Sequence, residues 1–137
     1  MTALSFLSMY MLMYAMVDST SAIHNNFNQV YMAGLMTAPM VVIELVLMSG
    51  MYHNKKANAL LMAASIVAGI LFFTFVRQQT LIADRQFLRS MIPHHSGAIL
   101  MCKNASLQDQ RITELCKQII ASQRAEIEQM RRLLQQF

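Results

Sequence analysis

The hydrophobic pattern divides the chain into two unlike halves. Three apolar runs occupy residues 1–17, 30–52 and 59–76, and a helix needs about 20 apolar residues to cross a hydrocarbon core about 30 Å thick. The second and third runs have 23 and 18 residues, whereas the first is a short span. From residue 77 onwards, apolar positions recur at steps of three and four, which is typical of amphipathic helices. The pattern predicts an all-α protein with three transmembrane helices followed by extramembrane helices.

The C-terminal half fits two amphipathic helices joined by a turn. The seam of the first helix comprises Asp84, Leu88, Met91, His95, Ala98, Cys102 and Ala105. The seam of the second comprises Ile112, Cys116, Ile119, Gln123, Glu126, Met130, Leu133 and Phe137. The turn covers residues 104–110, with Ser106 or Asp109 as N-cap. We predict two domains, a membrane anchor over residues 1–76 and an antiparallel helical hairpin over residues 77–137.

Two local features concern the start and the middle of the hairpin's first helix. No strong turn signal separates Val76 from Arg77, so we expect the third apolar run to continue into this helix. Pro93 has no N–H and leaves the carbonyl of Arg89 without its helical partner, so we expect a bend there.

Folding the hairpin brings chemically active residues to the same level. In antiparallel helices, facing residues have a constant sum of residue numbers, which the turn near residue 109 fixes. The facing pairs are then Cys102 with Cys116, His95 with Gln123, Met91 with Glu126 and Ile127, and Leu88 with Met130. One candidate cluster comprises Met91, His94, His95, Gln123, Glu126 and Met130, and a second comprises Cys102 and Cys116, with Met101 nearby. A rise of 1.5 Å per residue separates His95 from Cys102 by about 10 Å.

The composition supports the division into halves. The chain is 55% hydrophobic and 13% charged, with 14 methionines and no tryptophan. Residues 1–76 contain four charged side chains, namely Asp18, Glu44, Lys55 and Lys56, and residues 77–137 contain fourteen. Basic residues of the second half alternate with acidic ones and form no patch with interleaved aromatics, so nucleic acid is not an expected partner. The methionine excess can be flexible filler, so it only supports a metal hypothesis.

The charged loops predict an orientation in the membrane. The segment His53-Asn54-Lys55-Lys56 is basic, whereas residues 18–29 contain no Lys or Arg. The positive-inside rule places the lysine pair in the cytoplasm, and both residues 18–29 and the hairpin outside. The arginines that follow the third span oppose this assignment. We expect a bacterial inner (cytoplasmic) membrane, with the hairpin in the periplasm.

Glu44 is an ionisable residue inside the second apolar run. Such a group is costly in a membrane and is a functional candidate, yet no basic residue lies in any span to pair with it. Methionines at steps of four surround it, but a step of four turns the helix by about 400°, so only three consecutive members share one face. We favour a protonated Glu44 bonded to Tyr10 or Tyr14 over a transport role.

The residue types of the first cluster favour a soft metal ion. Thioether and imidazole ligands suit Cu(I). His94 and His95 point about 100° apart on a helix, so only one of them can face the interior fully. A buried hydrogen-bonded pair of His95 and Glu126 is the structural alternative. The two cysteines are compatible with a disulfide, with thiolate ligands, or with two small buried hydrophobic residues.

Two motifs resemble a known family. They are Asp84-x-x-Phe87-x-x-x-Met91-Ile92-Pro93-His94-His95-x-x-Ala98-x-x-Met101 and Ile120-x-x-Gln123-x-x-Glu126-Ile127-x-x-Met130. They resemble the membrane-anchored members of the family catalogued as domain of unknown function 305. The resemblance implies a ferritin-like four-helix-bundle relationship, an extracytoplasmic location, and copper or silver binding in some members. It maps metal-associated residues onto Met91, His94, His95, Met101 and Met130, with Asp84, Gln123 and Glu126 as supporting groups. Cys102 and Cys116 lie outside the family pattern.

A single hairpin supplies only half of a four-helix bundle, so a homodimer is expected. The leading hypothesis is a membrane-anchored protein that sequesters or passes on Cu(I), or another transition metal, without catalysis. Its partners would be membrane lipid, a second copy and copper-handling proteins. The alternatives are a structural membrane dimer with an inert polar core, a ferritin-like metal oxidase, and a thiol oxidoreductase. The sequence lacks the Glu-x-x-His motif of the oxidases and the Cys-x-x-Cys motif of the oxidoreductases.

Overall fold

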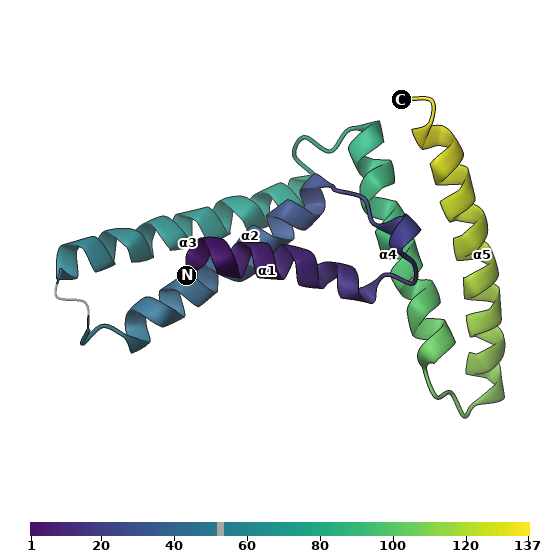
Figure 1. Ribbon diagram of the computed structural model, residues 1–137, viewed down its shortest axis with the longest axis horizontal. Coiled ribbons are helices and arrows are strands. Elements are labelled where there is room, and N and C mark those ends of the chain that lie inside the picture. The colour runs from purple at the N-terminus through teal and green to yellow at the C-terminus, as the bar shows by residue number, and fades with distance from the viewer. Residues whose placement is uncertain (52–53) are drawn as a thin grey trace. The chain divides into compact units, whose positions relative to one another are not determined.

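The computed structural model describes residues 1–51 and 54–137, and this part of the chain is all-α, with no strand. Five α-helices follow one another along the sequence (Figure 1). They are α1 (Thr2–Leu12), α2 (Phe27–Leu47), α3 (Lys55–Gln78), α4 (Asp84–Asn104) and α5 (Gln110–Leu134). Two short 3-10 helices, Met13–Met16 and Thr20–Ala22, lie between α1 and α2.

The helices form two compact units, which we describe separately. The first consists of Met1–Met13 and Asn28–Leu81, and the second consists of Tyr14–Phe27 and Ile82–Phe137. Residues 14–27 therefore belong to the same unit as α4 and α5, although they come before α2 in the sequence. We call this segment the strap.

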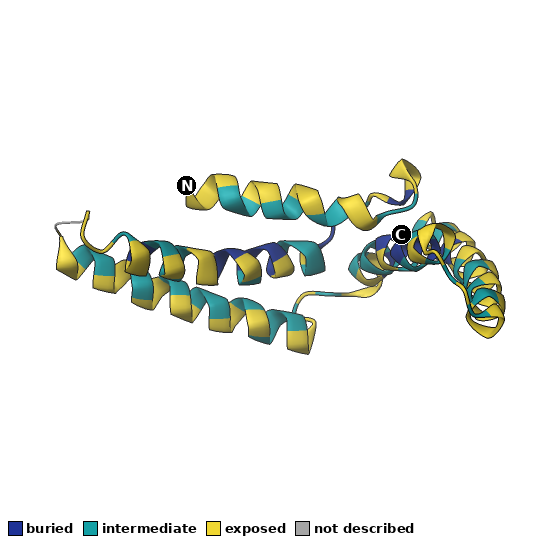
Figure 2. Cartoon of the chain, turned by 90° about the horizontal axis from the view of Figure 1, so that it is seen from below, coloured by how far each residue is buried: buried dark blue, intermediate teal, exposed yellow. Residues whose placement is uncertain are grey.

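In the first unit, α2 and α3 form a helical hairpin with close contacts at small residues. A Cβ atom on Gly34 would lie 2.5 Å from the ring of Phe72, and one on Gly69 would lie 3.3 Å from the Cβ atom of Ala38. Small residues of this kind allow helix backbones to approach closely in an apolar environment. The contact buries part of α2, whereas α3 has no buried residue (Figure 2).

Two helices of this unit, α2 and α3, are long and apolar enough to cross a membrane. The N-terminal run, which we predicted as a further span, is the shorter apolar helix Thr2–Met16, and its last turn is 3-10. Two parts of the sequence-based predictions, the end of the second run at residue 52 and His53 of the basic loop, lie outside the described residues.

The expected continuation of the third run into the hairpin was wrong, because α3 ends at Gln78. Gln79 adopts a left-handed conformation with φ of 51°, and Leu81 does the same with φ of 60°. Local hydrogen bonds hold this turn: the Tyr31 hydroxyl donates to the carbonyl of Thr80, and the Gln79 side chain donates to the carbonyl of Val76. The turn uses non-glycine residues at positive φ, so no glycine marks it in the sequence.

In the second unit, α4 and α5 form the predicted antiparallel hairpin, with Pro93 inside α4. Asp109 is the N-cap of α5 and accepts a hydrogen bond from the backbone N–H of Arg111 at 2.8 Å. The core of this unit comprises Ala22, Leu88, Ile92, Ile99, Ile127 and Met130. Ile92 is fully buried, so the core is centred on the middle of α4.

The strap packs along α4 and contributes Ala22 to this core. The backbone N–H of Asp18 donates to the Ser96 hydroxyl at 2.9 Å, and its carboxylate accepts two hydrogen bonds from Lys103, at 2.8 and 2.7 Å. The carbonyl oxygen of Met16 lies so close to Gly97 that an added Cβ atom would approach it to 3.2 Å.

Because the strap covers this side of α4, the buried face of the helix differs from the predicted seam. Ile92, Ser96 and Ile99 are buried, whereas the predicted seam residues Met91 and His95 are half-buried.

Candidate metal-binding site

His95 is the point at which the candidate site residues of α4 and α5 meet. Its Nδ1 atom lies 3.0 Å from Oε2 of Glu126, and the two side chains are 13% and 49% exposed. The distance is that of a hydrogen bond, but Nδ1 is buried and has no aligned hydrogen-bond acceptor among the described residues. The contact is therefore an electrostatic approach of a carboxylate to an imidazole rather than an aligned hydrogen bond.

The orientation of this imidazole determines what it can bind. Nδ1 faces the carboxylate, and Nε2 makes no hydrogen bond within the part of the chain that the structure describes. Histidine ligands of metals usually direct one ring nitrogen to a carboxylate or carbonyl and use the other for the metal. His95 with Glu126 has this arrangement. The observed partner of His95, Glu126, lies three residues beyond Gln123, the facing residue that the simple register gave.

His94 lies on the exposed side of α4. Its ring centroid is 6.3 Å from that of His95, and the ring planes differ by 60°. The structure thus turns one imidazole of the pair towards α5 and the other outward, as the rotation of about 100° per helical residue requires.

The three candidate methionines occupy different environments. Met130 belongs to the core and is 9% exposed, and Met91 is half-buried against the same core. Met101 is 56% exposed on the surface of α4. Met91 and Met130 are therefore near the interior between α4 and α5, and Met101 lies on the surface.

The supporting residues predicted from the family resemblance have separate locations. Asp84 is exposed in the first turn of α4, where a negative charge is favourable to the helix dipole. Gln123 is half-buried on α5. Within residues 1–51 and 54–137, no three His, Cys, Asp or Glu side chains gather into a group that could hold a metal ion. A site in this unit would therefore depend on thioether ligands.

Cys102 and Cys116 form a disulfide across α4 and α5, with their Cα atoms 5.3 Å apart. Both residues are half-buried. Of the three alternatives for this pair, the structure contains the covalent one. In this form neither sulfur is available as a thiolate ligand.

The turn next to the disulfide contains a local ion pair between solvent-exposed side chains. The Arg111 guanidinium donates to the carboxylate of Asp109 at 3.2 and 2.7 Å. This side-chain hydrogen bond, with the backbone N–H of Arg111, lowers the pKa of Asp109 below its ordinary value and raises the pKa of Arg111. Both residues lie on the surface at the start of α5, so the pair stabilises the turn locally.

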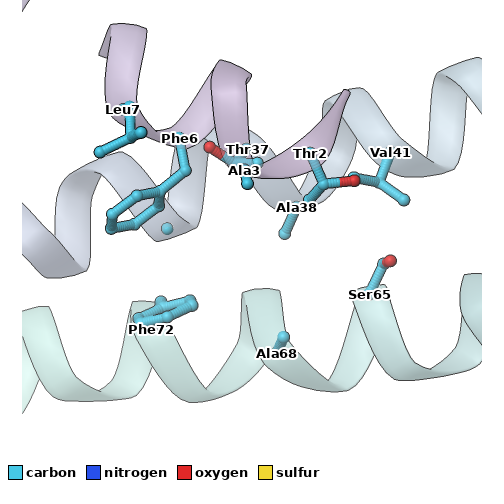
Figure 3. A pocket seen from close by; sticks show the side chains of 11 residues that line it. Thr2, Ala3, Phe6, Leu7, Thr37, Ala38, Val41, Ser65, Ala68 and Phe72 are labelled. Atoms are coloured by element: carbon cyan, nitrogen blue, oxygen red, sulfur yellow. The ribbon is translucent and has the colours of Figure 1, made fainter. Parts of the chain in front are cut away.

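A cavity of about 660 Å³ lies in the first unit, and none of the predicted metal ligands lines it (Figure 3). Its walls come from α1, α2 and α3, and they include Phe6, Ala38 and Phe72. The hydroxyls of Thr37 and Ser65 in its wall donate to carbonyls of their own helices. None of the described residues that line the cavity has an ionisable side chain. Glu44 is half-buried in α2 and is not part of its wall.

Sequence reasoning missed the strap and its histidine. Nδ1 of His24 is buried and has no hydrogen-bond partner among the described residues, which makes it the second such imidazole nitrogen in this unit. The carbonyl of His24 accepts hydrogen bonds from the Tyr14 hydroxyl and the Asn26 side chain. One signal was present in the sequence: Asp18 is one of four charges in residues 1–76, and it pairs with Lys103 of α4.

Comparisons with known proteins agree with the motif resemblance. Residues 36–134 match the family described as Domain of unknown function (DUF305). The chain is also 35% identical over 138 residues to the uncharacterized protein L153 of Acanthamoeba polyphaga mimivirus, a match that covers 98% of this chain and 88% of the viral protein. No solved structure matches the chain. The family match covers most of the chain, including α3 and the hairpin of α4 and α5, and the chain therefore belongs to the DUF305 family.

Proposed function

We propose that this chain is a membrane-anchored metal-binding protein that holds Cu(I), or Ag(I), in the hairpin of α4 and α5 and sequesters or transfers it without catalysis. One observation carries the proposal. Among the described residues, His95 directs Nδ1 at Glu126 and makes no hydrogen bond through Nε2, and Met91 and Met130 lie in the interior of the same hairpin.

The donor set fits a soft ion. Thioether sulfur and neutral imidazole suit Cu(I), whereas Fe²⁺ or Zn²⁺ sites depend on carboxylates, thiolates or several histidines. His95, Met91 and Met130 would hold the ion, and Glu126 would orient the imidazole. His94 and Met101, on the outer side of α4, would receive or release it. A ferritin-like oxidase gains no support, because its Glu-x-x-His motifs do not occur in the sequence.

The first unit would be the membrane anchor. Its helices α2 and α3 would span the bilayer, with Thr2–Met16 as a third, shorter crossing. Lys55 and Lys56 would face the cytoplasm, and the second unit would lie outside, where an oxidising environment supports its disulfide. In a bacterium this membrane would be the inner one, with the hairpin in the periplasm. The relative described above is viral. We therefore propose the orientation of the chain in its membrane and do not tie it to one organism.

A second copy would complete a four-helix bundle. The hairpin exposes large apolar side chains on both helices, which a partner hairpin would cover. They are Phe87 and Met101 on α4, and Ile112, Leu115 and Leu133 on α5. Copper-handling proteins would be the transient partners that deliver or accept the ion.

The same contact also supports a second candidate, a structural membrane dimer without metal. A half-buried imidazole beside a carboxylate is a common way to tolerate polar groups in a helical core. The two candidates differ in whether His95 binds a metal ion.

Cu(I) affinity of the purified full-length chain in detergent distinguishes the two candidates. A chromophoric Cu(I) chelator would compete with the oxidised, disulfide-bonded protein under anaerobic conditions. We expect wild type to bind, His95→Ala and Met91→Ala to weaken binding at least about 10-fold, and Glu126→Gln to weaken it by about 10- to 100-fold through loss of the orienting carboxylate.

The matched control is Met40→Ala, which removes a 41% exposed thioether from α2. It should bind as wild type does. Failure of the wild-type protein to compete with the chelator, or equal affinities of wild type and His95→Ala, would leave the structural dimer as the better account.

A further inference from the structure

The disulfide lies at a separate level of the hairpin from His95. Cys102 is seven residues beyond His95 on α4, a rise of about 10 Å at 1.5 Å per residue. One metal ion cannot bind the imidazole of His95 and both cysteine sulfurs across this distance. Any chemistry of the cysteine pair is therefore independent of the His95 site.

The pair is directly juxtaposed. Both cysteines are half-buried rather than enclosed in the core. The Cα atoms are 5.3 Å apart on facing helices. The sulfurs of the reduced pair would face each other across the seam.

Other contacts hold this end of the hairpin. The backbone N–H of Ala105 donates to the carbonyl of Met101, and Asp109 caps α5. On the strap side, Lys103 is bound to Asp18. The hydrophobic core, centred on Ile92, involves neither cysteine. Opening the disulfide therefore leaves the two thiols held on facing helices.

We propose that reduced Cys102 and Cys116 form a second, redox-gated Cu(I) site, with one thiolate from each helix. A dithiol reductant supplies two electrons and two protons, which convert the disulfide to two thiols while the reductant becomes a disulfide. The thiols then release two protons to solvent, and two Cu–S bonds form. Copper stays Cu(I) throughout, and thiolates are its preferred ligands. Oxidation of the pair abolishes this site and leaves the His95 site unchanged.

The test compares oxidised and reduced full-length protein in detergent. A phosphine reduces the disulfide and is removed by anaerobic desalting, after which Cu(I) is titrated against a chromophoric chelator. We expect reduced wild type to bind one more Cu(I) per chain than oxidised wild type, with a Cu(I)–thiolate charge-transfer band in the ultraviolet. Cys102→Ser/Cys116→Ser should show neither the gain nor the band.

Met91→Ala/His95→Ala serves as the matched variant, because it removes ligands of the proposed His95 site and keeps both cysteines. It should still gain one Cu(I) on reduction, so failure of the His95 proposal and failure of this one give different results. Equal copper binding by reduced and oxidised wild type would overturn the inference. Loss of helical circular dichroism on reduction would also overturn it, because the site requires a persistent hairpin.

Discussion

The two hairpins of this protein have similar lengths and opposite chemistry. Helices α2 and α3 contain 21 and 24 residues, and α4 and α5 contain 21 and 25. In the first hairpin, small residues bring the backbones together and α3 buries none of its side chains. In the second, Ile127 and Met130 of α5 are buried in a shared core, and a disulfide joins the helices. The two hairpins therefore share a topology but are stabilised by different interactions.

The difference agrees with the membrane location proposed for the first hairpin. A helix such as α3, which leaves most of its large apolar side chains exposed, gains little from burial in water but would suit a hydrocarbon environment. A hairpin of amphipathic helices gains its stability from an internal core and keeps charges outside. Polar groups such as His95 inside that second core are therefore the better candidates for function.

The largest expected contrast comes from one isoleucine in each hairpin. Ile92 is fully buried in α4, whereas Ile70 is 60% exposed on α3. Ile92→Ala should destabilise its hairpin by about 2–5 kcal/mol, because it leaves a cavity in a packed core. Ile70→Ala should change the stability of α3 by less than about 0.5 kcal/mol. Hydrogen exchange of α3 and α4 amides in detergent would measure both, and equal effects would contradict the contrast between the hairpins.

Removal of the disulfide should have the next largest effect, confined to the second hairpin. The bridge closes a loop with a sequence separation of 14 residues. A loop of about this length contributes about 3 kcal/mol by restricting the unfolded chain. Cys102→Ser/Cys116→Ser should lower the free energy of opening of α4 and α5 by that amount and leave exchange in α2 unchanged. A variant as stable as wild type would show that the hairpin core alone suffices.

The close contact of the first hairpin can be tested at Gly34. A Cβ atom there would approach the Phe72 ring to 2.5 Å, whereas one at Gly50 would have no atom of the described residues within 4 Å. Overpacking costs about 1–3 kcal/mol. Alanine gains about 1 kcal/mol over glycine in a helix, so the cost of overpacking equals or exceeds this gain. We expect Gly34→Ala to lower the thermal stability of α2 and α3, and Gly50→Ala to leave it unchanged. Phe72→Leu should restore the stability that Gly34→Ala loses. If it does not, the loss does not come from a clash with the Phe72 ring.

The smallest effect concerns the turn of the second hairpin and its dependence on pH. The pKa of Asp109 is lowered below 3.8 in the folded state by Arg111, so its stabilising contribution is fully present above the unfolded value. That contribution is lost as the pH falls below 3.8 through the lowered folded pKa. Asp109→Asn should reduce stability slightly at neutral pH and converge with wild type in strong acid. Acid titrations of hairpin unfolding that run parallel for both proteins would contradict this.

The sequence predicted the elements well where periodicity or length determined them. The apolar runs gave α2 and α3 because few other elements place about 20 apolar residues together. The index sum of the antiparallel hairpin placed Cys102 opposite Cys116, and the structure joins them. The index sum placed Gln123 opposite His95, whereas the observed contact is with Glu126, the partner that we also named from residue type as the structural alternative.

The strap and the end of α3 could not be predicted in this way. The strap docks through a long-range ion pair, Asp18 with Lys103, and a backbone approach at Gly97. The isolated charge of Asp18 was a signal for the strap, but its partner lies 85 residues away and cannot be identified from local sequence. The docking of the strap also shifted the buried face of α4 by about one residue from the predicted seam. The end of α3 depends on Gln79 at positive φ, which only tertiary contacts fix. The candidate ligands were identified by residue type. How far each one is exposed could not be predicted from the sequence.

X-ray absorption at the copper edge tests the central claim most directly. The sample is the oxidised full-length chain loaded with one equivalent of Cu(I), so that no free thiolate is present. The account predicts mixed sulfur and nitrogen coordination in wild type, with the imidazole signal lost in His95→Ala. Coordination without imidazole in wild type, or an identical spectrum in His95→Ala, would contradict it.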